Sequence, residues 1–91
     1  MNPEEGAALR DIQGYARANR VEFGPHAKKR MRERGAYEGD VVEALAKASR
    51  CTKNKECSDR WDVTGEDLDG DSLTAVVVIE DGIAVVTIFE K

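Results

Sequence analysis

The sequence predicts an α+β fold in which N-terminal helices pack on a C-terminal four-stranded antiparallel sheet. Up to Ala48 the apolar residues recur at helical spacing, and after it they alternate with polar residues as in half-buried strands. Asp81-Gly82 stands between two β-branched runs, residues 73–79 and 83–89, and this is typical of a tight hairpin because glycine accepts a positive φ. A chain of 91 residues is enough for one domain with a thin core, so we expect a single domain.

The first helix is expected at about residues 3–18. Asn2 is a capping residue, Pro3 suits the first helical position, and the carboxylates of Glu4 and Glu5 face the positive end of the helix dipole. The apolar residues that follow recur at helical spacing, so one face of this helix should be buried.

Two further helices are expected after a short extended connection at residues 21–23. Pro25 suits the first turn of the second helix, and Gly35 ends it as a C-cap. The third helix runs from about residue 38 to residue 48, with its valine, leucine and alanine residues turned inward.

The four strands are expected at residues 50–55, 59–66, 73–79 and 83–89. Residues 67–71 contain three aspartates and a glycine and resemble a calcium-binding loop. The glycine and glutamate positions that an EF-hand loop requires are not met, so we interpret this segment as a turn.

Cys51 and Cys57 are the only cysteines. Their spacing is not that of a zinc knuckle and the single histidine lies far upstream, so we predict no metal site and no cofactor. If the segment between them is a hairpin centred on Asn54, the two thiols face each other across the strands. We expect free thiols in a reducing cytosol. A small redox or metal protein built on these cysteines is the third interpretation of the chain.

Charge is separated along the chain although the net charge is only −4. Residues 17–60 carry twelve Lys and Arg against seven Asp and Glu, whereas residues 61–91 carry one lysine against eight acids. The basic segment can bind polyanions locally, because the Debye length is only about 8 Å at physiological salt. The alternative is a solvated helix face. No apolar run is long enough to span a bilayer and no signal peptide is evident, so we expect a cytoplasmic protein without a membrane partner.

The second helix carries the most distinctive pattern, a basic stripe beside a small apolar face. On a helical wheel His26, Arg30 and Arg34 follow the border of the face formed by Ala27 and Met31. Arginines at such a border can bury their stems and still reach a groove with the guanidinium. In the alternative interpretation these arginines pair with acidic residues of the sheet, such as Asp62 or Glu66.

This helix and the terminal hairpin together resemble a bacterial family of small domains of unknown function that is related to RelE/MqsR-type toxins of toxin–antitoxin systems. The resemblance covers about residues 22–90. The first helix, residues 1–19, lies outside it as an N-terminal addition to a toxin-like core at residues 20–91. The matching positions are His26, Ala27, Arg30, Met31, Arg34, Gly35, Val41, Leu45, Val76 to Val78, Asp81-Gly82 and Val85 to Thr87. The chain departs from the pattern at Ala36-Tyr37, where a serine or threonine cap is expected.

The resemblance implies a RelE/barnase-like fold, a metal-independent endoribonuclease activity on mRNA that is free or ribosome-associated, and a cognate antitoxin. It also implies a site formed by the histidine–arginine helix and a polar residue of the last strand, here Thr87. Histidine exchanges protons near neutral pH, so His26 is assigned as the general acid or base for attack by the 2′-hydroxyl. Arg30 and Arg34 are assigned as the phosphate clamp, and Thr87 as a positioning hydroxyl. The second proton-transfer role has no assigned residue.

Further RNA-binding residues are expected on the basic helix and the first hairpin: Lys29, Lys53, Lys55, Arg60 and Trp61, the last of which would stack on a base. The alternative function is a non-catalytic binding module that docks an acidic protein partner or RNA through its basic helix. The acidic C-terminal third favours that alternative. An exposed edge strand at about residues 50–55 could pair with a second copy, giving a homodimer, or with a strand of the antitoxin.

Overall fold

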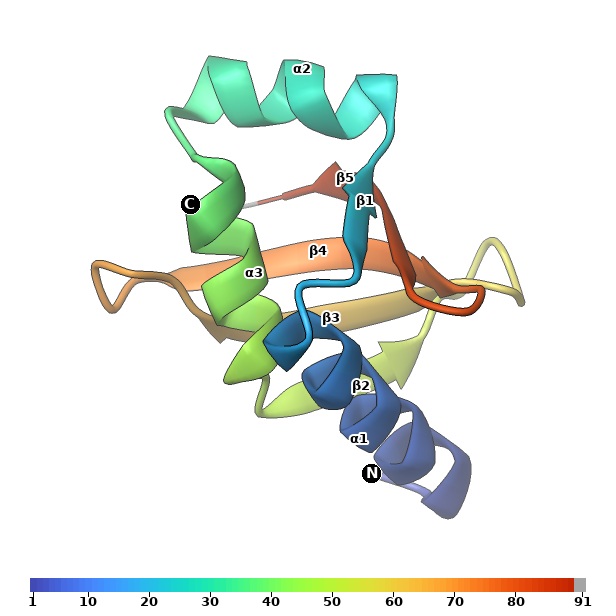
Figure 1. Cartoon of the computed structure of the whole chain (residues 1–91). Coiled ribbons are helices and arrows are strands. Elements are labelled where there is room, and N and C mark those ends of the chain that lie inside the picture. Colours follow the sequence, from blue (N-terminus) through green and yellow to red (C-terminus); the bar gives the residue numbers. More distant parts are fainter. Residues whose placement is uncertain (90–91) are drawn as a thin grey trace.

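Five strands form one mixed sheet in the order β1-β5-β4-β3-β2, and three helices pack on it (Figure 1). The computed structural model describes residues 1–89. The elements are α1 (Pro3–Arg17), β1 (Val21–Phe23), α2 (Pro25–Arg34), α3 (Glu38–Ala46), β2 (Arg50–Lys53), β3 (Trp61–Glu66), β4 (Ser72–Ile79) and β5 (Ile83–Ile88). The α+β class is confirmed. None of the helices in the described part of the chain has the length and apolar character needed to cross a bilayer.

The prediction of four antiparallel strands is wrong, because the segment Val21–Phe23 joins the sheet as a fifth strand, parallel to β5. Two hydrogen bonds flank this pairing: Ile83 N donates to Arg20 O at 2.9 Å, and Gly24 N donates to Val85 O at 3.0 Å. A run of three residues carries too little alternation to reveal a pairing partner at the far end of the chain.

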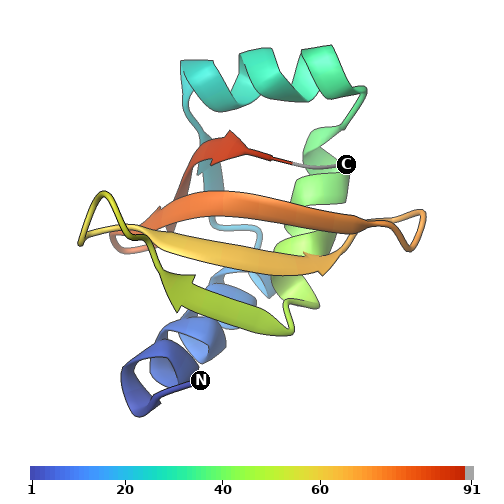
Figure 2. The same cartoon turned by 180° about the vertical axis from the view of Figure 1, so that it is seen from behind.

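Helices α1 and α3 cover one face of the sheet, and α2 lies along β5 (Figures 1 and 2). Leu73, Ala75 and Val77 of β4 are fully buried on the covered face. Gly65 of β3 pairs with Leu73 and lies directly beneath the backbone of Ala44 in α3. The opposite face carries no helix within residues 1–89; it is seen in Figure 2 and is called the open face below.

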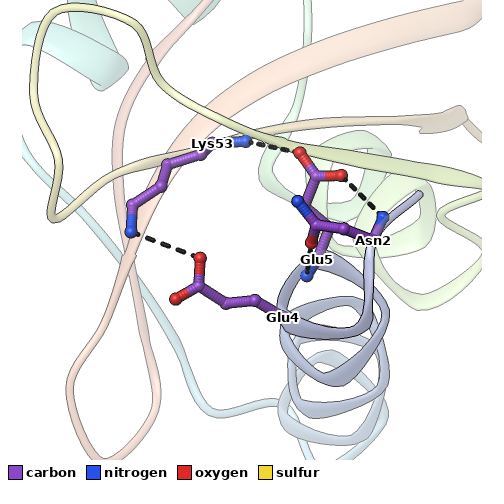
Figure 3. Close-up of polar contacts among 4 residues, drawn as sticks. All are labelled: Asn2, Glu4, Glu5 and Lys53. Atoms are coloured by element: carbon purple, nitrogen blue, oxygen red, sulfur yellow. Dashed lines mark hydrogen bonds and ion pairs between the residues drawn. The ribbon is translucent and has the colours of Figure 1, made fainter.

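The first turn of α1 closes the outer edge of β2 (Figure 3). Asn2 and Glu5 form a capping box, in which Glu5 N donates to Asn2 Oδ1 at 2.8 Å and Asn2 N donates to Glu5 Oε1 at 3.1 Å. The other carboxylate oxygen of Glu5 accepts from Lys53 N at 3.2 Å, and the Lys53 ammonium pairs with Glu4 at 3.3 Å. The N–H groups of Asn2 and Lys53 lower the pKa of the Glu5 carboxyl below its usual 4.5. The edge expected to pair with a second copy is therefore occupied by the N-terminal turn.

The prediction that the two thiols face each other is wrong. Cys51 is fully buried on the covered face, opposite Val63. Its burial raises the pKa of the thiol to about 11. Cys57 is half-buried in the connection between β2 and β3 and lines a pocket on the open face. Both cysteines are free.

Candidate functional site

Helix α2 is positioned by local signals and by a small apolar face. Pro25 occupies its first turn, and Gly35 ends it with a φ of 69°, a left-handed conformation that glycine adopts without strain. Ala36 N then donates to Met31 O at 2.9 Å, which satisfies a carbonyl group of the last turn. Ala27 and Met31 are 0% and 4% exposed, and the helix packs on β5. The apolar face predicted for this helix is confirmed.

The three residues of the predicted stripe differ in depth. His26 and Arg34 are exposed, whereas the side chain of Arg30 is only 33% exposed. The Arg30 Nε atom is buried and has no hydrogen-bond partner among residues 1–89. Arg30 Nη1 lies 3.9 Å from Glu33 Oε1, which is too long for a strong hydrogen bond. One third of the Arg30 side chain is exposed, so its other guanidinium donors can meet an anionic partner from outside the chain.

Most of the charge on α2 is not neutralised by other parts of the described chain. The helix has five Lys and Arg against the single acid Glu33. No ion pair joins α2 to the sheet within residues 1–89, so the pairing of its arginines with Asp62 or Glu66 is not observed. The other cations on this surface are all exposed: Lys28, Lys29 and Arg32.

A pocket of about 420 Å³ lies on the open face, with the connection between β2 and β3 as one wall; it is called the sheet-face pocket below. Three of the predicted site residues line it: Lys55, Arg60 and Thr87. The remaining lining residues are Asn54, Glu56, Cys57, Asp62, Val76 and Phe89. The stripe residues of α2 are not among them. The structure therefore divides the predicted site into the basic helix and this pocket, which are linked by β5.

One wall of the sheet-face pocket is fixed by Asn54. Its Oδ1 accepts from the backbone N–H groups of Glu56 and Cys57, at 3.0 and 2.9 Å. Its Nδ2 donates to Asp62 Oδ1 at 2.8 Å. Arg60 Nε is buried without a hydrogen bond to the described residues and lies 4.0 Å from Asp59 Oδ1. The two cations and two carboxylates among the lining residues balance each other.

Lys53 and Trp61, which were predicted to bind RNA, lie on the covered face of the sheet. The two residues are register partners across β2 and β3, and the Lys53 ammonium sits 5.6 Å from the centre of the Trp61 ring. Lys53 also pairs with Glu4 of α1. These two residues are therefore separated by the sheet from Lys55, Arg60 and Thr87.

Asn54, Asp62 and Phe89 line the pocket but were not assigned to the functional site from the sequence. The period of two along β5 gives one available signal, because it places Phe89 on the same face as Thr87. The roles of Asn54 and Asp62 depend on the conformation of the connection between β2 and β3, which no periodic pattern reports.

Three carboxylates come close enough to serve as metal ligands. Oxygens of Asp40, Asp67 and Asp69 lie within 4.8 Å of one another, and the first two residues are buried. Local structure accounts for them: Asp40 Oδ2 accepts from Tyr37 N at the start of α3, and Asp67 Oδ1 accepts from the N–H groups of Asp69 and Asp71 in the turn. The first of these bonds is the return half of a capping box, in which the N3 carboxylate accepts from the N–H group of the N-cap residue. Calcium takes six to eight oxygen ligands, more than three monodentate carboxylates provide.

Comparison with protein-family models gives no match to this chain. Comparisons with curated proteins and with solved structures give no significant match either.

Proposed function

We propose that this protein binds RNA through α2 and acts as a toxin of a toxin–antitoxin system, with a RelE/barnase-like fold and endoribonuclease activity on mRNA. The observation that carries the proposal is the charge of α2, five Lys and Arg against one acid, with no ion pair to the sheet within residues 1–89. Guanidinium and ammonium groups presented in this way suit a phosphate backbone. The family resemblance of this helix and the terminal hairpin supports the toxin class.

The side chains of His26, Arg30 and Arg34 supply a base and two cations for RNA cleavage without a metal. His26 takes the proton of a ribose 2′-hydroxyl, and the 2′-oxygen forms a bond to the adjacent phosphorus while the bond from phosphorus to the 5′-oxygen breaks. The products are a 2′,3′-cyclic phosphate and a 5′-hydroxyl, whose proton comes from the solvent or from a protonated group. Arg30 and Arg34 lie one and two helical turns beyond His26, at a rise of about 6 Å for each step of four residues. They neutralise charge on the phosphoryl oxygens.

Inducible expression in a bacterial host tests this function, with the wild type beside His26→Ala. The exposed position of His26 means that its removal should leave the fold intact. We expect growth arrest and loss of full-length mRNA for the wild type alone, with 2′,3′-cyclic phosphate ends on the fragments. Equal growth arrest and equal mRNA loss in both strains would refute the role of His26.

The second candidate is a non-catalytic module that uses α2 to bind RNA or an acidic protein such as a cognate antitoxin. It is favoured by the position of His26, which is exposed and does not line the pocket that holds Thr87. It predicts no growth arrest and no mRNA loss from either strain, although the soluble wild-type protein still binds RNA or the partner in vitro. The same expression experiment therefore separates the two candidates.

A further inference from the structure

The sheet-face pocket has the dimensions of a site for one flat ring. Asp62, Val76 and Thr87 are register partners across β3, β4 and β5, so they form one row on the open face. Neighbouring strands are about 4.8 Å apart, which puts the Cα atoms of Asp62 and Thr87 about 10 Å from each other. Val76 lies between them as an apolar floor and is 3% exposed. A single base fits between two side chains at this separation.

The carboxylate of Asp62 is held ready to accept hydrogen bonds. Asn54 donates to its Oδ1, and Asn54 is itself fixed by two backbone N–H groups of the connection. Asp62 Oδ2 makes no hydrogen bond within residues 1–89. A carboxylate has two acceptor oxygens and no donor, so it pairs best with two adjacent N–H donors. Among the four RNA bases only guanine offers such a pair, N1–H and N2–H, on its Watson–Crick edge.

The remaining groups of the pocket suit the rest of a nucleotide. Phe89 shares a face with Thr87 and its side chain is 46% exposed, so the ring is available for stacking on a base. Lys55 and Arg60 line the same pocket, and the exposed parts of their cationic side chains can contact a neighbouring phosphate. Because the positive and negative charges of its lining residues balance, the pocket is poorly suited to bind a phosphate group alone.

We infer that the sheet-face pocket binds one guanine base of single-stranded RNA, with Asp62 selecting the base and Phe89 stacking on it. This inference rests on the proposed binding of RNA to α2, and it adds base selection to a contact that is otherwise independent of sequence. The two sites are joined by β5, on which α2 packs and from which Thr87 projects into the pocket. RNA held by α2 therefore has a short path to the open face.

Fluorescence anisotropy with four labelled hexanucleotides tests the inference. The probes are UUGUUU, UUAUUU, UUCUUU and UUUUUU. We expect the wild type to bind the guanine probe about tenfold more tightly than the others, as one good bidentate base contact provides. Asp62→Asn should remove this preference, so that UUGUUU and UUUUUU bind the variant with equal affinity, while its amide oxygen can still accept the bond from Asn54. Glu66→Gln, an equal change of charge on an exposed residue of β3 outside the pocket, should keep the preference.

Two results would overturn the inference. One is wild-type binding of all four probes with equal affinity, which would leave the proposed RNA binding by α2 intact. The other is a guanine preference that survives Asp62→Asn. If no probe binds, the inference and the proposed RNA binding both fail.

Discussion

The contact between α3 and the sheet depends on the missing side chain of Gly65. A Cβ atom built at this position would lie 2.0 Å from Ala44 O, 2.9 Å from Ala44 C and 3.1 Å from Ala48 Cα. All three are backbone atoms, so no change of rotamer can relieve the contact. Carbon atoms pack at about 3.5–4.0 Å, so Gly65→Ala must push α3 away from β3 by more than about 1 Å. The shift would loosen the packing of Val41 and Leu45, which are 0% and 1% exposed.

Overpacking of a core usually costs about 1–3 kcal/mol, and we place this variant at or above the upper end because backbone must move. At about 4–8 °C per kcal/mol for a domain of this size, a cost of about 3 kcal/mol lowers Tm by about 12–24 °C. Gly14→Ala is the matched control, since a Cβ there meets nothing within 4 Å. It should stabilise α1 by about 0.5–1 kcal/mol. Thermal and chemical denaturation measure the stability of both variants. A cost below about 1 kcal/mol for Gly65→Ala would refute the packing argument.

Three further predictions concern α1 and the thiols. Asn2→Ala should lower the free energy of unfolding by about 1 kcal/mol through loss of the cap, as measured by urea denaturation. The pKa of the Glu5 carboxyl is lowered in the fold, so the stability that this carboxylate contributes is present above its usual pKa of 4.5 and is lost as the pH falls through the folded value. Glu5→Gln should therefore reduce the loss of stability between pH 7 and pH 3. An unchanged profile of stability against pH would contradict this. A thiol reagent at pH 7 should modify Cys57 quickly and Cys51 only on unfolding, because Cys51 is buried and the pKa of its thiol is about 11. Fast modification that persists in Cys57→Ser would show that Cys57 is not the reactive thiol.

Much of the fold follows from signals that act over a few residues. The cap at Asn2 and the stop at Gly35 are both used as predicted, and the Asp81-Gly82 turn has the positive φ angles expected of it, 47° and 128°. The parallel strand Val21–Phe23 was missed because its partner is distant and its alternation too short. The register of the last hairpin was also out of reach, because a bulge between Val76 and Val77 interrupts it and an almost continuous β-branched run does not show where a bulge falls.

The candidate site also has one part that the sequence predicts and one part that it does not. The stripe of α2 was predictable because Ala27 and Met31 fix which face of the helix is buried. The sheet-face pocket was not predictable, because it depends on three strands lying side by side and on the turn that Asn54 stabilises through its side chain. Sequence spacing alone placed Lys53 beside Lys55, whereas the two lie on opposite sides of the sheet.

The central claim is that α2 binds RNA through its unneutralised cations, and the salt dependence of RNA binding tests it most directly. The affinity for a single-stranded RNA is measured by anisotropy between 50 and 200 mM KCl. Salt weakens this binding because about one condensed counterion is released for each phosphate that the protein contacts. Lys29→Gln with Arg34→Gln removes two exposed cations of α2. Arg10→Gln with Lys47→Gln removes two exposed cations elsewhere and makes the same change in net charge.

Each phosphate contact on a single strand contributes about −0.7 to the slope of log K against log salt, so the α2 variant should lose about 1.4 of this slope. The control variant should keep the wild-type slope. Equal slopes for the wild type and both variants, or no measurable RNA binding at 50 mM KCl, would contradict the account.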